Sequence, residues 1–285
     1  MTLEEARAKV EDWLVKTSLY EEVAGSDVSD CHHAIQALIL RAKPFDAHCV
    51  ECKRAATFKP DLDDEQRGMV LHGTPEYVKQ YCLRQNLFTV TATCARSAAH
   101  RMQFVFRHHP GRGVQKIGQY PSIADLSIPE TSQFVKVLGQ DRVRELNKAI
   151  GLATHGVGVG SYIYLRRIFE SLVEDAHKEA AGEGEEGDDE FNDWDEDAYK
   201  RARMDERITM LKDYLPKFLV EHPQLYGILS KHLHELSEND CLQNFDAMKE
   251  AILIIARDKL KAHEEKEQRA TTAKLLQKIG STMKS

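Results

Sequence analysis

The spacing of apolar residues predicts helices at both ends of the chain. Leu3, Ala6, Val10 and Leu14 recur at the three- to four-residue interval that places side chains on one helical face, and residues 29–41 read as a second helix. The second half of the chain shows the same interval repeatedly. It predicts helices over residues 132–153, 162–177, 198–219, 223–236 and 241–263.

The middle of the chain has a different pattern. Residues 87–93 are rich in β-branched side chains, and residues 103–107 alternate apolar and polar positions, so both segments are predicted strands. We therefore expect an α+β protein that is mainly α. Its expected parts are N-terminal helices (1–43), a small strand-bearing module (44–116), a linker (117–131), a helical domain (132–263) with an acidic loop (182–197), and a charged helical tail (264–285).

Charge is distributed unevenly along the chain. The net charge is -7, but residues 183–197 hold ten acidic residues and no basic ones, so the rest of the chain is about +3 by the same count. The segment 95–119 shows the opposite bias, with five basic residues and no acidic one. These five residues, the basic strip, are Arg96, Arg101, Arg107, Arg112 and Lys116.

A basic strip of this kind is a candidate nucleic-acid contact, because Lys and Arg neutralise phosphates. Phe104 and Phe106 lie within the strip, and aromatic rings can stack on unpaired bases. The alternative is that both rings fill a small core while the arginines are solvated. The acidic loop 182–197 is predicted to be solvated, and it could compete with nucleic acid for the strip.

Four residues have the spacing of zinc ligands. Cys49 and Cys52 form a C-x2-C pair, and Cys94 and His100 supply a second pair from a predicted strand. Thiolate and imidazole ligands suit Zn²⁺, and four protein ligands leave no open position for a catalytic water. We therefore predict structural zinc in a zinc-ribbon-like module. The alternative is a chance C-x2-C beside two unrelated buried residues.

Hydropathy and cysteine content argue against a membrane-spanning or secreted protein. No run of eighteen apolar residues exists, and the N-terminal segment is charged and amphipathic, so neither a membrane span nor a secretory signal is expected. Six cysteines at irregular spacing favour reduced thiols and metal binding over a disulfide framework. The expected location is the cytoplasm.

The segment 149–170 contains Leu165-Arg166-Arg167 with Glu170 three positions on, and Gly118-Gln-Tyr-Pro121 follows a cysteine-bearing segment. With these motifs the chain resembles a bacterial HEPN-like domain of unknown function from restriction-linked and phage-defence proteins. It implies a HEPN-like helical bundle and a homodimer. The apolar face within residues 247–256 is one candidate dimer surface, with burial in the core as the alternative.

The resemblance also implies that the chain could be a ribonuclease, because active HEPN proteins cleave RNA with an Arg and a downstream His and need no metal. The corresponding place here holds Lys231 and His234, and Lys cannot grip a phosphate bidentately. Arg166, Arg167 and Glu170 are further candidates. Three functions follow: a non-enzymatic nucleic-acid-binding or adaptor protein of a defence or mobile-element setting, a metal-independent endoribonuclease with an altered motif, and a scaffold that binds only protein partners.

Overall fold

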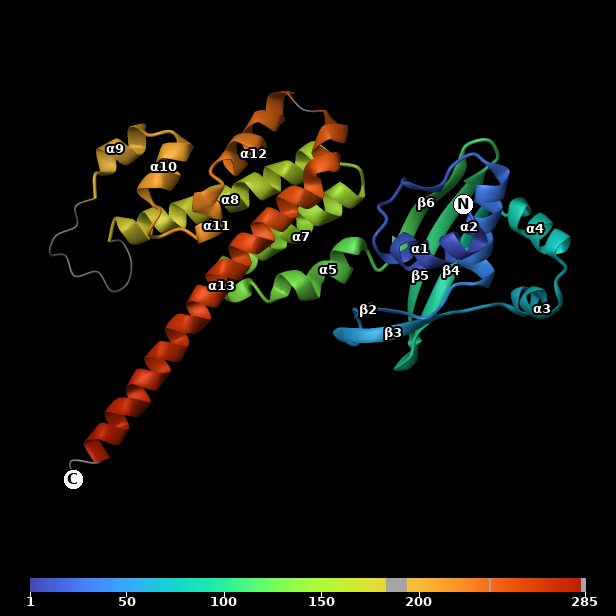
Figure 1. The fold of residues 1–285 in the computed structure, drawn as a ribbon, viewed down its shortest axis with the longest axis horizontal. Coiled ribbons are helices and arrows are strands. Elements are labelled where there is room, and N and C mark those ends of the chain that lie inside the picture. The colour runs from blue at the N-terminus through green and yellow to red at the C-terminus, as the bar shows by residue number, and fades with distance from the viewer. Residues whose placement is uncertain (183–193, 236, 283–285) are drawn as a thin grey trace. The chain divides into compact units, whose positions relative to one another are not determined.

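The computed structural model describes residues 1–182, 194–235 and 237–282, with side chains except those of 231–235 and 280–282. The chain forms two compact units. The first, called here the sheet unit, comprises Met1–Glu130 with Ile150–Gly156, and the second, the helical unit, comprises Thr131–Ala149 with Val157–Ser285. Figure 1 labels the elements of both.

The sheet unit contains one six-stranded antiparallel sheet, in the order β1-β6-β5-β4-β3-β2, that curls into a half-barrel. The strands are β1 (Glu22–Ala24), β2 (Phe45–Cys49), β3 (Arg54–Pro60), β4 (Leu87–Cys94), β5 (Ser97–His109) and β6 (Gly113–Tyr120). Five of the strands follow in chain order as hairpins or simple returns. β1 instead joins the far edge, where Glu22 pairs with Gln115.

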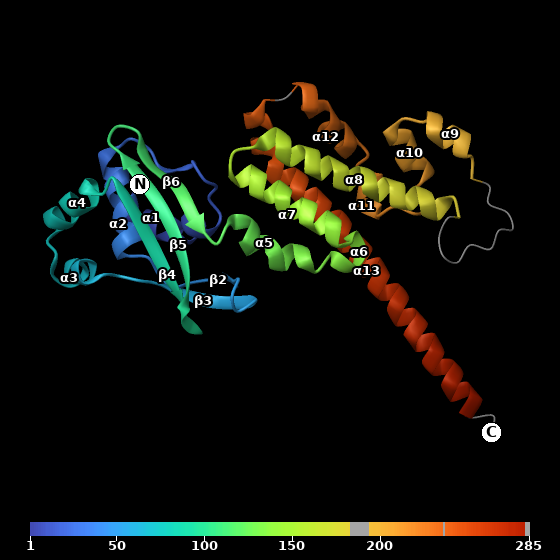
Figure 2. The same ribbon diagram turned by 180° about the vertical axis from the view of Figure 1, so that it is seen from behind.

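One face of this sheet is the core of the unit. Along β5, Met102, Phe104 and Phe106 are buried, whereas the alternate residues Arg101 and Arg107 are exposed, as the two-residue strand period requires. The buried side packs with helices α1 (Leu3–Val15) and α2 (Val28–Leu40). In Figure 2 strands β4 to β6 lie in front of these helices, so the view is onto the opposite, open face.

Two short helices connect β3 to β4. They are α3 (Asp64–His72) and α4 (Pro75–Arg84), each opened by a side-chain cap, from Asp63 and Thr74 respectively. Both pack against α2, and Met69, Val78 and Cys82 are their buried residues. The sheet unit also receives α5 (Ile123–Ser132) and the last residues of α7 (Gln140–Thr154).

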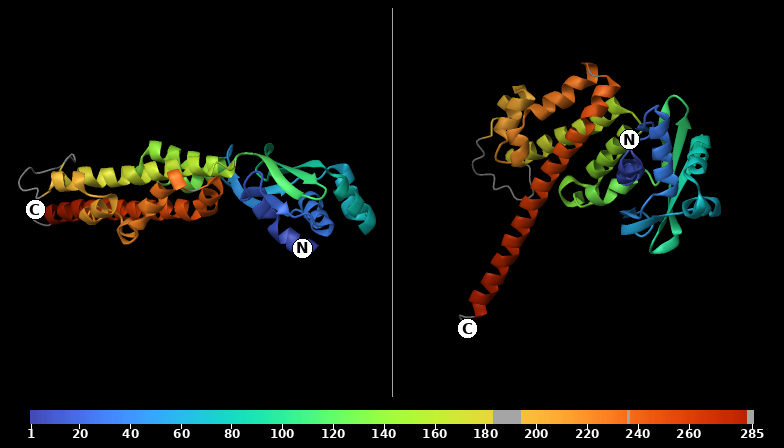
Figure 3. Two further views of the ribbon diagram at one scale, coloured as in Figure 1. Left: turned by 90° about the horizontal axis from the view of Figure 1, so that it is seen from above. Right: turned by 45° about the vertical axis from the view of Figure 1, so that its right-hand side comes forward.

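The helical unit is built around α8 (Gly158–Ala180), whose buried face includes Tyr162, Leu165, Phe169 and Leu172. It packs with α12 (Gln224–Glu235) and α13 (Glu238–Thr282). The shorter helices are α6 (Val135–Leu138), α9 (Glu196–Arg201), α10 (Met204–Met210) and α11 (Lys217–Glu221). Figure 3 shows α13 as one continuous helix that contains the predicted helix 241–263 and residues 264–282 of the predicted tail.

The predicted fold class, a small zinc-ribbon-like module beside a HEPN-like helical bundle, is wrong. Residues 44–116 do not fold as a separate ribbon, because their strands share one sheet with β1 and one core with α1 and α2. The expected N-terminal part (1–43) therefore belongs to the same compact unit. A six-stranded half-barrel backed by helices replaces the small module.

The structure also bears on two further predictions, the dimer surface within 247–256 and the absence of a membrane span. The apolar face within 247–256 contributes Ala251, Ile252 and Ile255 to the buried core of the helical unit, so these residues are not exposed for a dimer contact. Among the described helices, none combines the length and the apolar character that crossing a membrane requires.

Candidate functional site

The first two candidate ligands come from one tight turn. Cys49 is the last residue of β2, and Cys52 follows in the turn that leads to β3. The backbone N–H of Cys52 donates to the Sγ of Cys49 over 3.4 Å, and Lys53 takes a left-handed backbone with φ 54°. This turn reverses the chain so quickly that both sulfur atoms face the same side.

The other two candidates come from the β4–β5 hairpin. Cys94 ends β4 opposite Phe58 of β3, and His100 lies near the start of β5. The hairpin register shifts after Thr93, which pairs with Arg101, while Cys94 pairs with Ser97. Extra residues on β5 at this irregularity place His100 beside the ends of β2 and β4.

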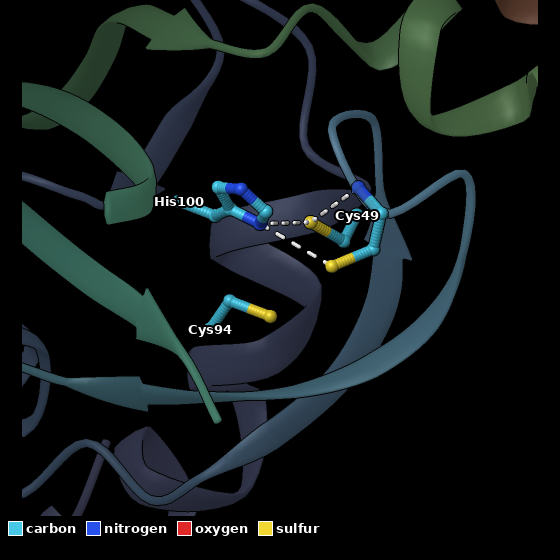
Figure 4. Close-up of side chains that lie close together, drawn as sticks. Cys49, Cys94 and His100 are labelled. Carbon is cyan, nitrogen blue, oxygen red and sulfur yellow. Dashed lines mark hydrogen bonds between the residues drawn. The ribbon is translucent and has the colours of Figure 1, made fainter. Parts of the chain in front are cut away.

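The four residues meet in a cluster with the dimensions of a metal site. Their ligand atoms all lie within 4.8 Å of one another. The Nδ1 of His100 is 3.7 Å from the Sγ of Cys49 and 3.2 Å from that of Cys52. Zinc–ligand bond lengths predict about 3.6 Å between sulfur and nitrogen in a tetrahedral site. Figure 4 shows Cys49, Cys94 and His100 pointing toward a common centre.

The surroundings of the cluster shift the pKa values of the Cys49 and Cys94 thiols in opposite directions. Burial raises the pKa of the Cys49 thiol to about 12. Burial also raises that of Cys94, but hydrogen bonds from the backbone N–H groups of Arg96 and Ser97 lower it, and the net pKa lies below the usual value. Donors aimed at a sulfur atom favour the thiolate, which is the form that binds metal.

The predicted ligand set is therefore brought together in space, and it can hold a metal ion. Cys49 and Cys94 are buried, and Cys52 and His100 are half-buried. The cluster joins the ends of three strands at the core-facing side of the sheet. Cys82, a further cysteine of this unit, is fully buried in α4 and belongs to the apolar core.

Most of the basic strip is exposed, on and around β5. Arg101 and Arg107 lie on the open face of the strand, and Arg96 and Arg112 lie in the turns at its two ends. Within the described part of the chain, none of these four arginines has a carboxylate oxygen within 4 Å. Their charge is therefore available to an external anion.

The fifth residue of the strip has a different place. Lys116 is fully buried, and its Nζ donates to the carbonyl oxygens of Leu14, over 2.6 Å, and Thr17, over 2.8 Å. Burial lowers the pKa of Lys116 to about 7. Lys116 thus holds the end of α1 against β6 and is not a surface contact. Phe104 and Phe106 are also fully buried, so neither ring is available for base stacking.

The arginines proposed for catalysis are engaged in ion pairs. The Nε of Arg166 donates to Glu170 over 2.8 Å, and the Tyr226 hydroxyl donates to the same carboxylate over 3.2 Å. Arg167 pairs with Glu145 of α7 over 2.7 Å. These contacts connect helices of the helical unit. Lys231 and His234 lie outside the residues whose side chains are described.

Only the end of the acidic loop 182–197 is described. There, Glu196 accepts hydrogen bonds from the Nε2 of His177, over 2.7 Å, and from the Nε1 of Trp194, over 3.0 Å. The hydrogen bond from His177, the largest cause, lowers the pKa of Glu196 to about 2. This carboxylate is therefore committed to a contact between α8 and α9. Residues 183–193 lie outside the described residues, and competition with the basic strip stays a prediction.

The sequence did not reveal a small cavity of about 160 Å³ at the β5–β6 turn. Its lining comprises Glu22, Arg107, His109, Arg112, Gly113 and Gln115. The two arginines were part of the predicted strip, but Glu22 reaches the cavity only through the pairing of β1 with β6. No local sequence signal marks that pairing, because β1 is three residues long.

Searches of protein-family models, of curated proteins and of solved structures find no match to this chain. The resemblance to the HEPN-like family stays a prediction.

Proposed function

We propose that the sheet unit binds one Zn²⁺ through Cys49, Cys52, Cys94 and His100, and that this ion is structural. The observation that supports the proposal is the convergence of four ligand atoms within 4.8 Å. Three thiolates and one imidazole form a soft, four-coordinate set, which favours Zn²⁺ over the harder Mg²⁺ and Ca²⁺. Iron is the main competitor for such a set, and it would colour the protein.

A structural role follows from the number and origin of the ligands. Four protein ligands complete a tetrahedron, so no position remains for a water that would attack a substrate. The ligands come from chain segments about fifty residues apart, as the 51-residue separation of Cys49 and His100 illustrates. Binding therefore adds stability to the long-range strand arrangement rather than to one local turn.

We further propose that this zinc-stabilised unit is a non-enzymatic nucleic-acid-binding protein, with the exposed arginines as phosphate contacts. Arg96, Arg101, Arg107 and Arg112 belong to one hairpin system that begins at the candidate metal ligands, and no described carboxylate oxygen lies within 4 Å of their guanidinium nitrogens. An unpaired guanidinium can bind a phosphate through two parallel hydrogen bonds. The buried Phe104 and Phe106 favour backbone contacts over base stacking.

The test combines metal content with nucleic-acid binding at two salt concentrations. We expect about one zinc per chain, and affinity for single-stranded RNA or DNA that falls steeply as salt rises. Double charge reversal, Arg101→Glu with Arg107→Glu, should abolish this binding and leave the zinc content unchanged. Lys9→Glu with Lys79→Glu, on exposed helical positions, is the matched control for net charge.

Other results would redirect the proposal. Zinc without salt-sensitive binding would reject the nucleic-acid function and favour an adaptor that binds protein partners. Cleavage of RNA by metal-free protein would restore the ribonuclease alternative. The pairing of Arg166 with Glu170 and of Arg167 with Glu145 argues against that alternative, because both guanidiniums already have carboxylate partners.

A further inference from the structure

We propose that the cavity at the β5–β6 turn binds the terminal phosphate of a nucleic-acid strand. The inference rests on the proposed nucleic-acid binding and assigns one end of the strand to one place on the sheet. It is carried by the cavity of about 160 Å³ and by the chemistry of its lining.

The cationic side of the cavity comes from Arg107 and Arg112. Each guanidinium offers five N–H donors, and neither has a carboxylate oxygen within 4 Å among the described residues. His109 adds an imidazole ring, whose nitrogens can donate or accept hydrogen bonds. Its Nδ1 lies 2.8 Å from the carbonyl oxygen of Pro110, so Nδ1 carries the hydrogen and Nε2 remains for a ligand.

The backbone holds this lining in place before any ligand arrives. The N–H of Arg112 donates to the carbonyl oxygen of His109 over 2.9 Å and closes the turn. Gly113 has φ 116°, and a Cβ there would lie 2.2 Å from the carbonyl oxygen of Ala24. Glycine thus lets β6 approach β1 closely enough for Glu22 to form the opposite wall. A preformed site avoids part of the ordering cost of binding.

A terminal phosphate matches this lining better than an internal one. A phosphate monoester carries a charge of about −1.5 to −2 and three free oxygens at neutral pH, whereas an internal phosphodiester carries one charge. Two unpaired guanidiniums suit the larger charge. The Glu22 carboxylate accepts hydrogen bonds but repels anions, so it fits a sugar hydroxyl of the same terminal nucleotide and disfavours a bare inorganic ion.

The remainder of the strip supplies a path for the strand. Arg101 lies six residues before Arg107 on the same face of β5, which corresponds to about 20 Å along the strand. Arg96 lies beyond it, in the turn next to the ligand Cys94. A strand anchored in the cavity can therefore follow β5 toward the metal cluster, with internal phosphates near Arg101 and Arg96.

The test compares one short oligonucleotide in three forms: with a 5′-phosphate, with a 3′-phosphate and with neither. The readout is the affinity of the full-length protein for each, at one salt concentration. We expect one phosphorylated form to bind about tenfold more tightly than the unphosphorylated form, as charge-assisted hydrogen bonds to one additional phosphate predict.

Substitutions test whether the preference for a terminal phosphate comes from the cavity. Arg112→Gln should reduce the affinity ratio to about one, and Arg107→Gln is the second variant should the first fold poorly. Arg101→Gln should weaken all forms and preserve the ratio, and Arg84→Gln, on exposed α4, should change nothing. Equal affinity of all three forms for the wild-type protein would overturn the inference alone. Absence of binding by every form would overturn the proposed function as well.

Discussion

The Sγ of Cys52 lies 3.2 Å from the Nδ1 of His100, although 48 residues separate them in the chain. Cys52 lies in the turn between β2 and β3, and His100 lies in β5, which β4 separates from β3 in the sheet. Two strand spacings in a flat sheet would place β3 and β5 about 10 Å apart. The curl of the half-barrel and the turn after β2 close this distance, so a bound metal would fasten that end of the sheet.

Loss of one ligand should remove the metal and weaken the sheet unit. We expect His100→Ala to lower zinc content well below one per chain and to reduce the free energy of unfolding by at least about 2 kcal/mol. Elemental analysis and urea denaturation measure these effects. His48→Ala, a half-buried neighbour on β2 outside the cluster, should keep its zinc. Full metal content in His100→Ala would contradict the assignment of that ligand.

The buried Lys116 predicts an unusual dependence of stability on pH. Its pKa is about 7 in the folded protein and about 10.5 when exposed, so the unfolded chain binds more protons between these values. The free energy of unfolding should therefore rise with pH from about 7 toward 10, by up to about 1.4 kcal/mol per pH unit. Below about pH 7, Lys116 is protonated in both the folded and the unfolded states, so it no longer makes the free energy of unfolding depend on pH.

Lys116→Met should flatten that rise, because it removes the titrating group and keeps an apolar chain in the core. Urea denaturation at several pH values between 7 and 10 measures the effect. Lys59→Met, at an exposed position of β3, should retain the wild-type slope. Parallel stability curves for the wild type and Lys116→Met would show that the amine does not change protonation in this range.

The ion pair between Arg142 and Asp175 should stabilise the helical unit. Its two hydrogen bonds measure 2.5 and 2.7 Å, and it joins α7 to α8. We expect Asp175→Asn to lower the free energy of unfolding of this unit by about 1–3 kcal/mol, since a half-buried guanidinium loses its partner. Thermal unfolding followed by circular dichroism measures it.

The matched control is the exposed pair of Arg144 with Asp141, three residues apart on α7. Asp141→Asn should cost less than about 0.5 kcal/mol, because exposed ion pairs are screened by water. Equal effects of the two substitutions would indicate that the bidentate geometry of Arg142 adds no stability.

Gly113→Ala should disrupt the junction of β1 and β6. The added Cβ would meet the carbonyl oxygen of Ala24 at 2.2 Å, and the φ of 116° is unfavourable for alanine. A loss of more than about 2 kcal/mol in unfolding free energy is expected. Gly111→Ala, with φ 79° and no atom near its Cβ, should cost only about 1 kcal/mol. Hydrogen exchange at residues 22–24 would locate the damage in β1.

The spacing of apolar residues in the sequence predicted several helices, but it missed α3 and α4 and predicted one helix over 198–219 where α9, α10 and α11 are separate. The segments 3–14, 29–41 and 162–177 fall within or near α1, α2 and α8, since a helix depends on residues three and four apart. The strands were predicted only in part. Leu87–Thr93 and Gln103–Arg107 lie in β4 and β5, but the sheet also requires β1, β2, β3 and β6, which were not predicted. The pairings of β1 with β6 and of β3 with β4 depend on residues far apart in the sequence.

Residue type and spacing alone identified the four residues of the cluster that can hold a metal ion, because a C-x2-C turn with a second Cys and His pair is typical of metal sites. Residue type was a poor guide to the basic strip. Arg101 and Lys116 look equivalent in the sequence, yet one is exposed on the open face and the other is buried under α1. Their difference depends on which strand face the helices cover.

The sequence by itself thus determined α1, α2 and α8 and the four residues of the Cys/His cluster, because these depend on local spacing and on side-chain chemistry. Only the tertiary structure decided that the six strands between residues 22 and 120 form one sheet, that Lys116 is buried, and that Glu22 meets Arg107 and Arg112 at one cavity. These features depend on pairing between strands that are distant in the sequence. Such pairing is stabilised by the apolar surface that the paired strands bury together, so no short stretch of residues specifies it.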